Sequence, residues 1–176
     1  MKDYKKLRDA FTYAVKHYDG EVRKGSNIPY IIHPLHILTI LRSTGFSDFK
    51  NEDLMIAALF HDLIEDTEVC EEDIANHFGK KIASIVKELS NPEHGNKEDH
   101  FRKLQDASYE AKVIKLADRI DNLSDIHSIN WPIEKKRSYL KQGKIILESC
   151  GEAHQDLADK LEEIIRKNLE KFEKKN

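Results

Sequence analysis

The sequence contains few cysteines, glycines and prolines, and it has no long apolar run. Its two cysteines, Cys70 and Cys150, lie far apart and fit neither a zinc-binding spacing nor a disulfide framework. The longest apolar run, which ends at Phe60, is far shorter than the roughly 20 residues of a membrane-spanning helix. The first residues lack the apolar segment of a secretory signal, and a net charge of −3 gives no general basic field for nucleic acid or an anionic membrane. We therefore expect a cytoplasmic protein without a membrane or nucleic-acid partner.

Helical periodicity is the main pattern that is present. Apolar residues recur at spacings of three and four, and sustained strand-type alternation is absent. A length of 176 residues fits one domain, so we expect a single all-α domain over 1–176, a helical bundle of roughly eight to ten helices. Its motifs fall within about 4–146, and a last helix follows at about 153–174. The expected helices are 4–17, 33–45, 52–65, 71–78, 80–90, 97–105, 109–126, 133–149 and 153–174.

Two of these helices carry clear burial patterns. The helix at 52–65 is apolar nearly all round up to Phe60, which is typical of a helix buried by its neighbours, and Asn51 is expected to cap it. The residues expected to face the core from the first helix are Leu7, Ala10, Phe11, Ala14 and Val15.

Metal-binding residue types occur in three of the apolar segments. They are His33 before a proline, the adjacent pair His61 and Asp62, and Asp118. Successive helical residues differ by about 100° in direction, so His61 and Asp62 can reach one point beyond their helix. His33 and Asp118 would complete a set of two imidazoles and two carboxylates, which suits Mn²⁺, Fe²⁺ or Zn²⁺.

Two more carboxylates follow one turn later. Glu65 is four residues after His61, and Asp66 is four residues after Asp62, so both share the predicted metal face. So many acids near a core require either a divalent cation or raised pKa values. Glu65 or Asp66 could then orient or deprotonate a water for attack on phosphorus or carbonyl carbon.

Each of these residues taken alone has a structural interpretation. His33 could simply begin a helix, Asp118 could pair with Arg119 or Lys115, and Glu65 could lie at a solvated helix end. The combination of all six in one helical scaffold favours the metal interpretation.

The sequence around these residues resembles a known family. The segments that carry the likeness are 23–25, 29–34, 58–67 and 113–123, which include Arg-Lys-Gly, Tyr-Ile-Ile-His-Pro, His-Asp-Leu-Ile-Glu-Asp-Thr and Lys-Leu-Ala-Asp-Arg. They resemble the HD-domain metal-dependent phosphohydrolases and, more narrowly, the hydrolase domain of the RelA/SpoT homologues in its stand-alone, small alarmone hydrolase form. The likeness implies hydrolysis of the 3′-pyrophosphate of ppGpp and pppGpp, which gives GDP or GTP and pyrophosphate.

The resemblance also implies roles for individual residues. The implied Mn²⁺ ligands are His33, His61, Asp62 and Asp118. Glu65 and Asp66 would position and activate the attacking water. The implied nucleotide-binding residues are Arg23, Lys24 and Asn122; Asn122 lies four residues after Asp118, and Lys115, three residues before it, could face the same pocket.

Several alternatives stay open at this point. Asp121 departs from the His or Tyr found in many family members, and it could face solvent or alter how the nucleotide is held. The same machinery could act on another nucleotide, such as NADPH or an adenine alarmone, or serve a non-catalytic nucleotide sensor. The segment 91–105, with His94 and His100, is given no role. The oligomeric state is not predicted, and a homodimer is one option.

Overall fold

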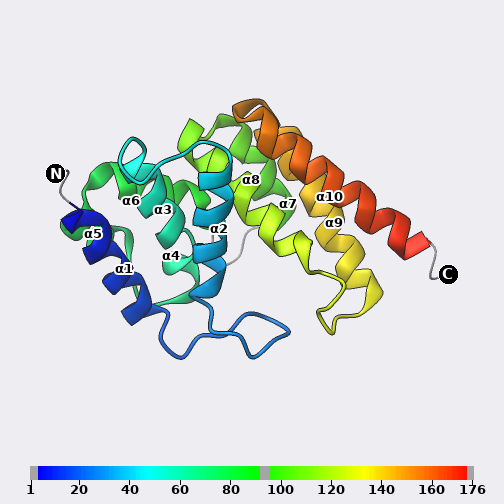
Figure 1. Ribbon diagram of the computed structural model, residues 1–176, viewed down its shortest axis with the longest axis horizontal. Helices are drawn as coiled ribbons and strands as arrows, with labels where there is room; N and C mark the ends of the chain where they lie inside the picture. Colours follow the sequence, from blue (N-terminus) through cyan, green and yellow to red (C-terminus); the bar gives the residue numbers. More distant parts are fainter. Residues whose placement is uncertain (1–3, 92–95, 174–176) are drawn as a thin grey trace. The chain divides into compact units, whose positions relative to one another are not determined.

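The structure is a computed structural model that describes residues 4–91 and 96–173. Its contacts divide the chain into two compact units, 1–94 and 95–176. Helices form both units (Figure 1), and the only strand-type pairing among the described residues is an isolated bridge between Val22 and Pro29. The all-α prediction is therefore confirmed, whereas one domain over 1–176 stays a prediction. The expected helix end at 174 and His94 lie outside the described residues.

The first unit, as far as it is described (4–91), consists of six helices and their connections. They are α1 (Lys5–His17), α2 (Ile32–Ser43), α3 (Glu52–Phe60), α4 (Leu63–Asp66), α5 (Glu71–Phe78) and α6 (Lys80–Leu89).

The centre of this unit is α3, which packs against α1, α2 and α6. Every residue from Leu54 to Phe60 is buried, as the sequence predicts for a helix that is apolar all round. Pro34 lies in the first turn of α2, where a missing N–H is tolerated, and Gly45 follows the end of α2 with a φ of 97°. These boundaries agree with the sequence prediction.

The predicted continuous helix over 52–65 is wrong, because the helix ends at Phe60 and a separate turn, α4, begins at Leu63. Nδ1 of His61 lies 3.0 Å from the carbonyl oxygen of Ala58. In a continuing helix that carbonyl would accept from the N–H of Asp62. The side chain of His61 competes for it, and Asp62 leaves the helix with a φ of −108°.

Two further details differ from expectation. Val15 is 55% exposed and faces solvent rather than the core. Asn51 precedes α3 as expected, but its side chain makes no cap to that helix; instead its Oδ1 accepts a hydrogen bond from the N–H of Ser47 at 3.0 Å. The side chain that was expected to cap the helix is therefore used in a hydrogen bond within the preceding turn.

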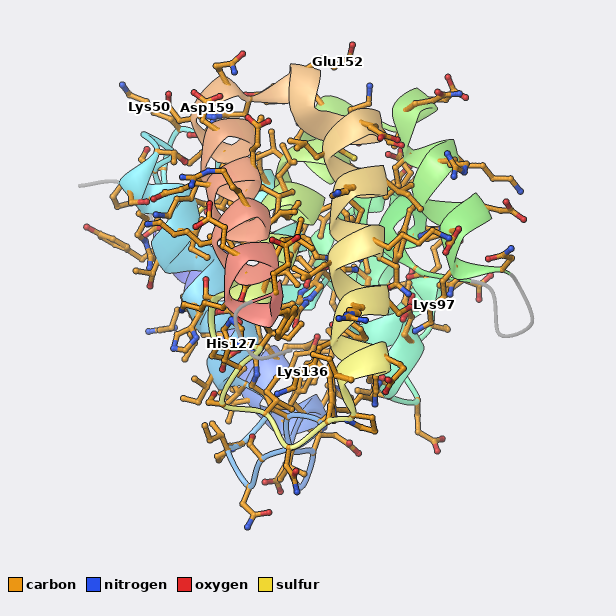
Figure 2. All side chains as sticks on the ribbon, turned by 90° about the vertical axis from the view of Figure 1, so that its right-hand side faces the viewer. Lys50, Lys97, His127, Lys136, Glu152 and Asp159 are labelled. Carbon is orange, nitrogen blue, oxygen red and sulfur yellow. The ribbon has the colours of Figure 1, made fainter. Side chains whose placement is uncertain are left out.

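The described residues of the second unit, 96–173, form four α-helices and two short 3₁₀ helices. The α-helices are α7 (Lys97–Lys103), α8 (Tyr109–Ser124), α9 (Ile133–Cys150) and α10 (Gln155–Glu173), with 3₁₀ turns at Leu104–Asp106 and Gly151–Ala153. α8, α9 and α10 pack pairwise against one another, and Figure 2 shows α9 and α10 side by side. The connection between α8 and α9 is fixed to α9, because Nζ of Lys136 donates to the carbonyl oxygen of His127 at 3.2 Å (Figure 2).

The start of α8 is fixed by Ser108, whose hydroxyl accepts a hydrogen bond from the N–H of Ala111. We expect Ser108→Ala to lower the free energy of unfolding by about 1 kcal/mol, since an N–H in the first turn loses its acceptor. Ser108→Asp keeps an acceptor and should restore most of the loss. Denaturant unfolding of the three proteins measures the difference; equal stability of Ser108→Ala and the parent would show that the cap is unimportant.

In the described part of the chain, no helix combines the length and the apolar character needed to cross a membrane.

Candidate active site

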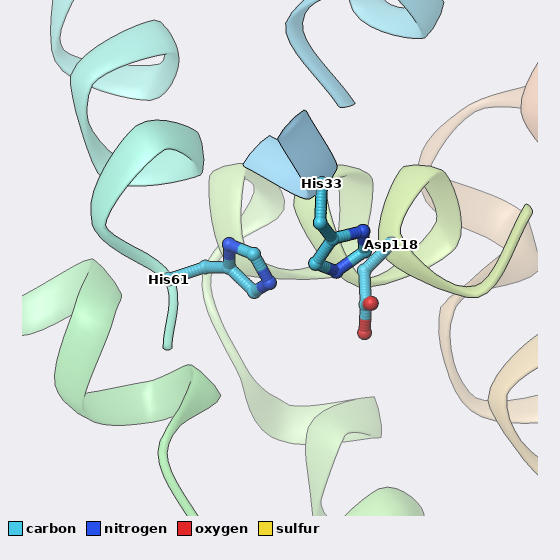
Figure 3. A group of neighbouring side chains, drawn as sticks. All are labelled: His33, His61 and Asp118. Carbon is cyan, nitrogen blue, oxygen red and sulfur yellow. The ribbon is translucent and has the colours of Figure 1, made fainter. Parts of the chain in front are cut away.

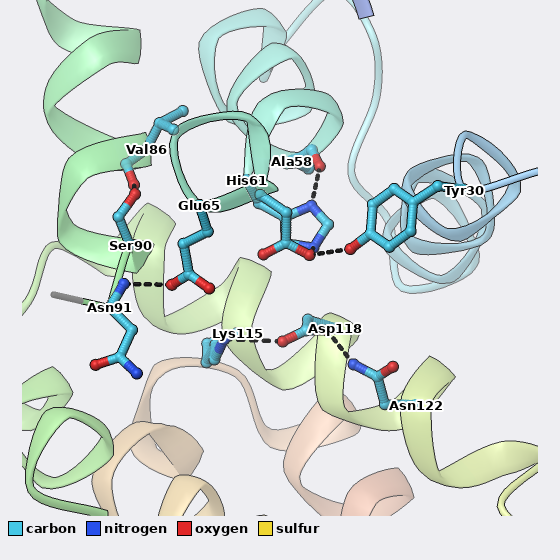
Figure 4. Close-up of polar contacts among 11 residues, drawn as sticks. Tyr30, Ala58, His61, Glu65, Val86, Ser90, Asn91, Lys115, Asp118 and Asn122 are labelled. Carbon is cyan, nitrogen blue, oxygen red and sulfur yellow. Dashed lines mark hydrogen bonds and ion pairs between the residues drawn. The ribbon is translucent and has the colours of Figure 1, made fainter. Parts of the chain in front are cut away.

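His61 lies at the end of α3, and its ring is held in one orientation. The side chain is 1% exposed, and Nδ1 faces the carbonyl oxygen of Ala58 at 3.0 Å (Figure 4). A carbonyl only accepts, so Nδ1 carries the hydrogen and donates it. This leaves Nε2 as the ring atom available to a ligand, which is the usual arrangement of a metal-binding histidine.

Nε2 of His61 faces the carboxylate of the next residue. Oδ2 of Asp62 lies 2.9 Å away, yet Nε2 makes no hydrogen bond of good geometry within the described residues. With the ring hydrogen on Nδ1, the lone pair of a buried nitrogen faces an oxygen of a half-buried carboxylate. Such a pair needs a cation between or beside it, either a proton or a metal ion. The donor chemistry therefore fits a divalent metal.

His33 is also buried in the first unit, in the first turn of α2. Its ring lies edge-on to that of His61, with 5.0 Å between the ring centroids; both side chains are drawn in Figure 3. The two imidazoles that the sequence predicted as ligands are thus brought together from segments 28 residues apart. An imidazole nitrogen is a common metal ligand, so the pair offers two such donors in one place.

Glu65 and Asp66 lie on α4, just beyond Asp62. Oε1 of Glu65 accepts a hydrogen bond from the backbone N–H of Asn91 (Figure 4). Burial, and then the charge of Asp62, raises the pKa of Asp66, while Lys24 and His61 act in the opposite direction. The acids that the sequence placed on one face therefore do gather, although a turn and not a continuous helix brings them there.

Arg23 and Lys24 occupy a closed loop in the same unit. The N–H of Arg23 donates to the carbonyl oxygen of Ile28 at 2.9 Å, and the N–H of Ser26 donates to the carbonyl oxygen of Arg23 at 3.0 Å. Lys24 is exposed, and Arg23 is half-buried. A phosphate ligand requires positive charge nearby. The overall charge of the chain is negative, whereas this loop carries two cationic side chains.

Asp118 lies in the second unit, where it is 4% exposed on α8. Its Oδ2 is 2.9 Å from Nζ of Lys115, and its Oδ1 accepts from the side-chain amide of Asn122 (Figure 4). Lys115 is itself buried and lies 5.4 Å from the centre of the Phe101 ring. Both residues predicted to contact the nucleotide from α8 therefore hold the carboxylate of Asp118 in place.

Asp121 and Arg119 have different environments on α8. Asp121 is 8% exposed, so the expectation that it could face solvent is wrong. The guanidinium of Arg119 lies 5.3 Å from the ring centres of both Phe101 and Tyr139. The buried ion pair of Asp118 is with Lys115, and Arg119 lies between aromatic rings.

Two contacts with these acids could not be predicted from the sequence. The hydroxyl of Tyr30 donates a hydrogen bond to Oδ2 of Asp62, and the backbone of Asn91 donates to Glu65 (Figure 4). Burial, and then the charge of Asp62, raises the pKa of Tyr30, so its hydroxyl keeps its hydrogen as a donor. The only available signal for Tyr30 was its position three residues before His33; a backbone donor such as that of Asn91 leaves no signal in a sequence.

Comparison with known proteins places these features in a family context. The HD domain matches residues 10–146. The chain is 30% identical to the guanosine-3′,5′-bis(diphosphate) 3′-pyrophosphohydrolase MESH1 of Drosophila melanogaster, over 92% of this chain and 93% of that protein. It is 25% identical to the Homo sapiens protein of the same name, over 91% of this chain and 93% of that protein.

A solved structure is also similar over nearly the whole chain. That structure was described in a study of a metazoan ortholog of SpoT that hydrolyzes ppGpp and plays a role in starvation responses. It is 29% identical, with a TM-score of 0.86 over 96% of this chain and 98% of that one. The likeness therefore extends from the motifs to the fold.

Proposed function

The chain belongs to the HD-domain family and, within it, to the MESH1 group of stand-alone hydrolases, and on this premise we propose that it is a ppGpp and pppGpp 3′-pyrophosphohydrolase. The products would be GDP or GTP and pyrophosphate. The observation that carries the proposal is that relatives named for this reaction match the chain over almost its whole length and theirs. We further propose a cytoplasmic location, as the sequence predicts.

Membership of the HD family, together with the donor set, implies a divalent metal ion. We propose Mn²⁺, with Fe²⁺ and Zn²⁺ as alternatives, and the ligands His33, His61, Asp62 and Asp118. When bound, the ion would supply Lewis acidity toward phosphoryl oxygens and a water of lowered pKa. The fixed ring of His61 and the paired carboxylate of Asp118 are the features that support this assignment.

The reaction requires water to attack the phosphorus bonded to the ribose 3′-oxygen. The new bond joins the water oxygen to phosphorus, the 3′-O–P bond breaks, and the 3′-oxygen gains a proton. Glu65 would accept the proton of the attacking water, and Asp66, whose pKa is raised by burial and by the charge of Asp62, would orient that water. The hydrogen bond from the backbone N–H of Asn91 to Oε1 restricts the direction of the Glu65 carboxylate for this role.

The substrate's phosphates need cationic side chains and neutral hydrogen-bond donors. We propose Arg23 and Lys24 from the closed loop, with Lys115 and Asn122 from α8. The loop's internal hydrogen bonds reduce the conformational entropy that would otherwise be lost when its side chains bind a phosphate. Lys115 and Asn122 already contact Asp118, so they would act close to a proposed metal ligand.

A substrate panel tests the proposal. Purified, Mn²⁺-loaded protein is incubated separately with ppGpp, pppGpp, an adenine alarmone and NADPH, and the products are identified. We expect the guanosine compounds to have the highest kcat/KM. Preferential hydrolysis of NADPH or of the adenine compound would keep the enzyme class and overturn the substrate assignment, and binding without turnover would indicate a sensor.

Asn91→Pro tests whether the backbone donor to Glu65 matters. Ser90 has φ −70° and ψ 136°, a conformation that suits a residue before proline, and the change removes the N–H of residue 91. We expect kcat to fall by roughly 10-fold, because an acid that loses a donor is less well placed. Asn91→Ala keeps the N–H and should stay within about 2-fold of the parent. Equal kcat for the proline and alanine variants would exclude a positioning role for this hydrogen bond.

A further inference from the structure

Tyr30 joins the Arg23–Lys24 loop to the helix that carries His33. Its N–H donates to the carbonyl oxygen of Glu21 at 2.8 Å, beside the bridge between Val22 and Pro29. Its own carbonyl oxygen accepts from the N–H of His33 at 2.9 Å. The backbone of Tyr30 is therefore fixed on both sides, by the loop that precedes it and by the start of α2.

The ring of Tyr30 is fixed as firmly as its backbone. The ring centroid lies 5.1 Å from that of Tyr18, which is 2% exposed, and 5.6 Å from that of His33, which meets it edge-on. With the ring held between these neighbours, the hydroxyl reaches Oδ2 of Asp62 and donates to it (Figure 4). A side chain from the loop segment thereby fixes a carboxylate 32 residues further along the chain.

The consequence of this contact concerns the direction of the Asp62 carboxylate. Asp62 follows the end of α3 and is only half-buried, so packing alone does not hold its side chain. Its Oδ2 must stay beside Nε2 of His61 if the two are to share one ion. A hydrogen bond from a rigid tyrosine restricts the carboxylate to that orientation before any ion binds, which is how outer partners of metal ligands act.

We propose that Tyr30 is a positioning residue: its hydroxyl fixes the Asp62 carboxylate beside His61 and so raises the affinity of the site for a divalent ion. This inference rests on the proposed role of Asp62 as a metal ligand. It adds a residue that acts through Asp62 and does not itself touch the ion. It also gives the loop that carries Arg23 and Lys24 a physical link to the metal site, because one residue belongs to both.

The test compares Tyr30→Phe with Tyr4→Phe. Both changes remove one hydroxyl and keep the ring, and Tyr4 is 53% exposed, with its ring edge-on to that of Phe49. The affinity of metal-free protein for Mn²⁺ is measured by calorimetry. We expect Tyr30→Phe to weaken binding by roughly 10- to 100-fold, the range for outer partners of metal ligands, and Tyr4→Phe to stay within about 2-fold of the parent. Unchanged Mn²⁺ affinity in Tyr30→Phe would overturn the proposal.

A double-variant cycle separates positioning from a general effect on folding. If Tyr30 acts through Asp62, the loss caused by Tyr30→Phe should shrink to less than about 2-fold when Asp62→Asn is already present. An undiminished loss in that background would assign Tyr30 a role elsewhere in the structure and contradict the inference. These measurements follow binding and not turnover, so a parent protein that binds Mn²⁺ but leaves ppGpp intact would overturn the proposed function alone. A parent that binds no divalent ion would overturn both.

Discussion

Replacing Glu65 with glutamine is expected to lower kcat for ppGpp by roughly 10²- to 10⁴-fold, the range for removal of a general base. Glutamine has nearly the same shape, and its carbonyl oxygen can still accept from the N–H of Asn91, so the loop contact is preserved. What it cannot do is accept the proton of the attacking water. Since Glu65 is not among the proposed ligands, the Mn²⁺ content should stay unchanged.

Glu68→Gln is the matched control. Glu68 lies three residues further on and is exposed, and the same chemical change there should leave kcat within about 2-fold of the parent. Steady-state kinetics at saturating Mn²⁺, with the metal content measured on each protein, distinguishes a loss of catalysis from a loss of bound metal. Full activity in Glu65→Gln would remove this residue from the mechanism, and a parallel loss of metal would reassign it as a ligand.

The second large effect is expected at Asp118. This carboxylate is buried and lies 2.9 Å from the buried ammonium of Lys115. Asp118→Asn removes the carboxylate charge that faces this ammonium, and breaking a buried pair in this way typically lowers the free energy of unfolding by about 3–5 kcal/mol. The same change removes one of the four proposed ligands, so we also expect little bound Mn²⁺. Denaturant unfolding in EDTA and elemental analysis measure the two effects independently.

A double variant separates the two roles of Asp118. Lys115→Met together with Asp118→Asn removes both charges of this buried pair. We expect this protein to recover most of the lost stability, while its Mn²⁺ content stays low because the ligand is still absent. Parental metal content in Asp118→Asn or in the double variant would show that Asp118 is not a ligand. Unchanged stability in Asp118→Asn would show that the ion pair contributes little.

Sequence periodicity predicted much of the fold because burial and helix signals are local. The apolar run up to Phe60 predicted a buried helix, and Pro34 and Gly45 marked its neighbour's start and end; both predictions are confirmed. The prediction that Val15 faces the core was wrong. An apolar residue at the edge of a helical stripe can remain exposed, and spacing alone does not show where the stripe ends.

In the candidate site, local sequence patterns predicted the residue types but not the contacts between distant residues. The candidate metal ligands could be recognised from their residue types. The helix break at His61 could not be predicted, since it depends on a side chain that competes for the carbonyl of Ala58. The contact between Tyr30 and Asp62 joins residues 32 apart, and only the folded chain brings them together. Asp121 was ambiguous for the same reason, because its burial depends on the packing of α8.

The most direct test of the central claim is product identification after one complete reaction of ppGpp with the purified, Mn²⁺-loaded protein. The proposed chemistry predicts GDP and pyrophosphate in equal amounts, and no product when Mn²⁺ is removed with EDTA. Release of orthophosphate in place of pyrophosphate would contradict cleavage at the ribose 3′-oxygen. Intact ppGpp after incubation with folded protein and any of Mn²⁺, Fe²⁺ or Zn²⁺ would contradict the proposed activity itself.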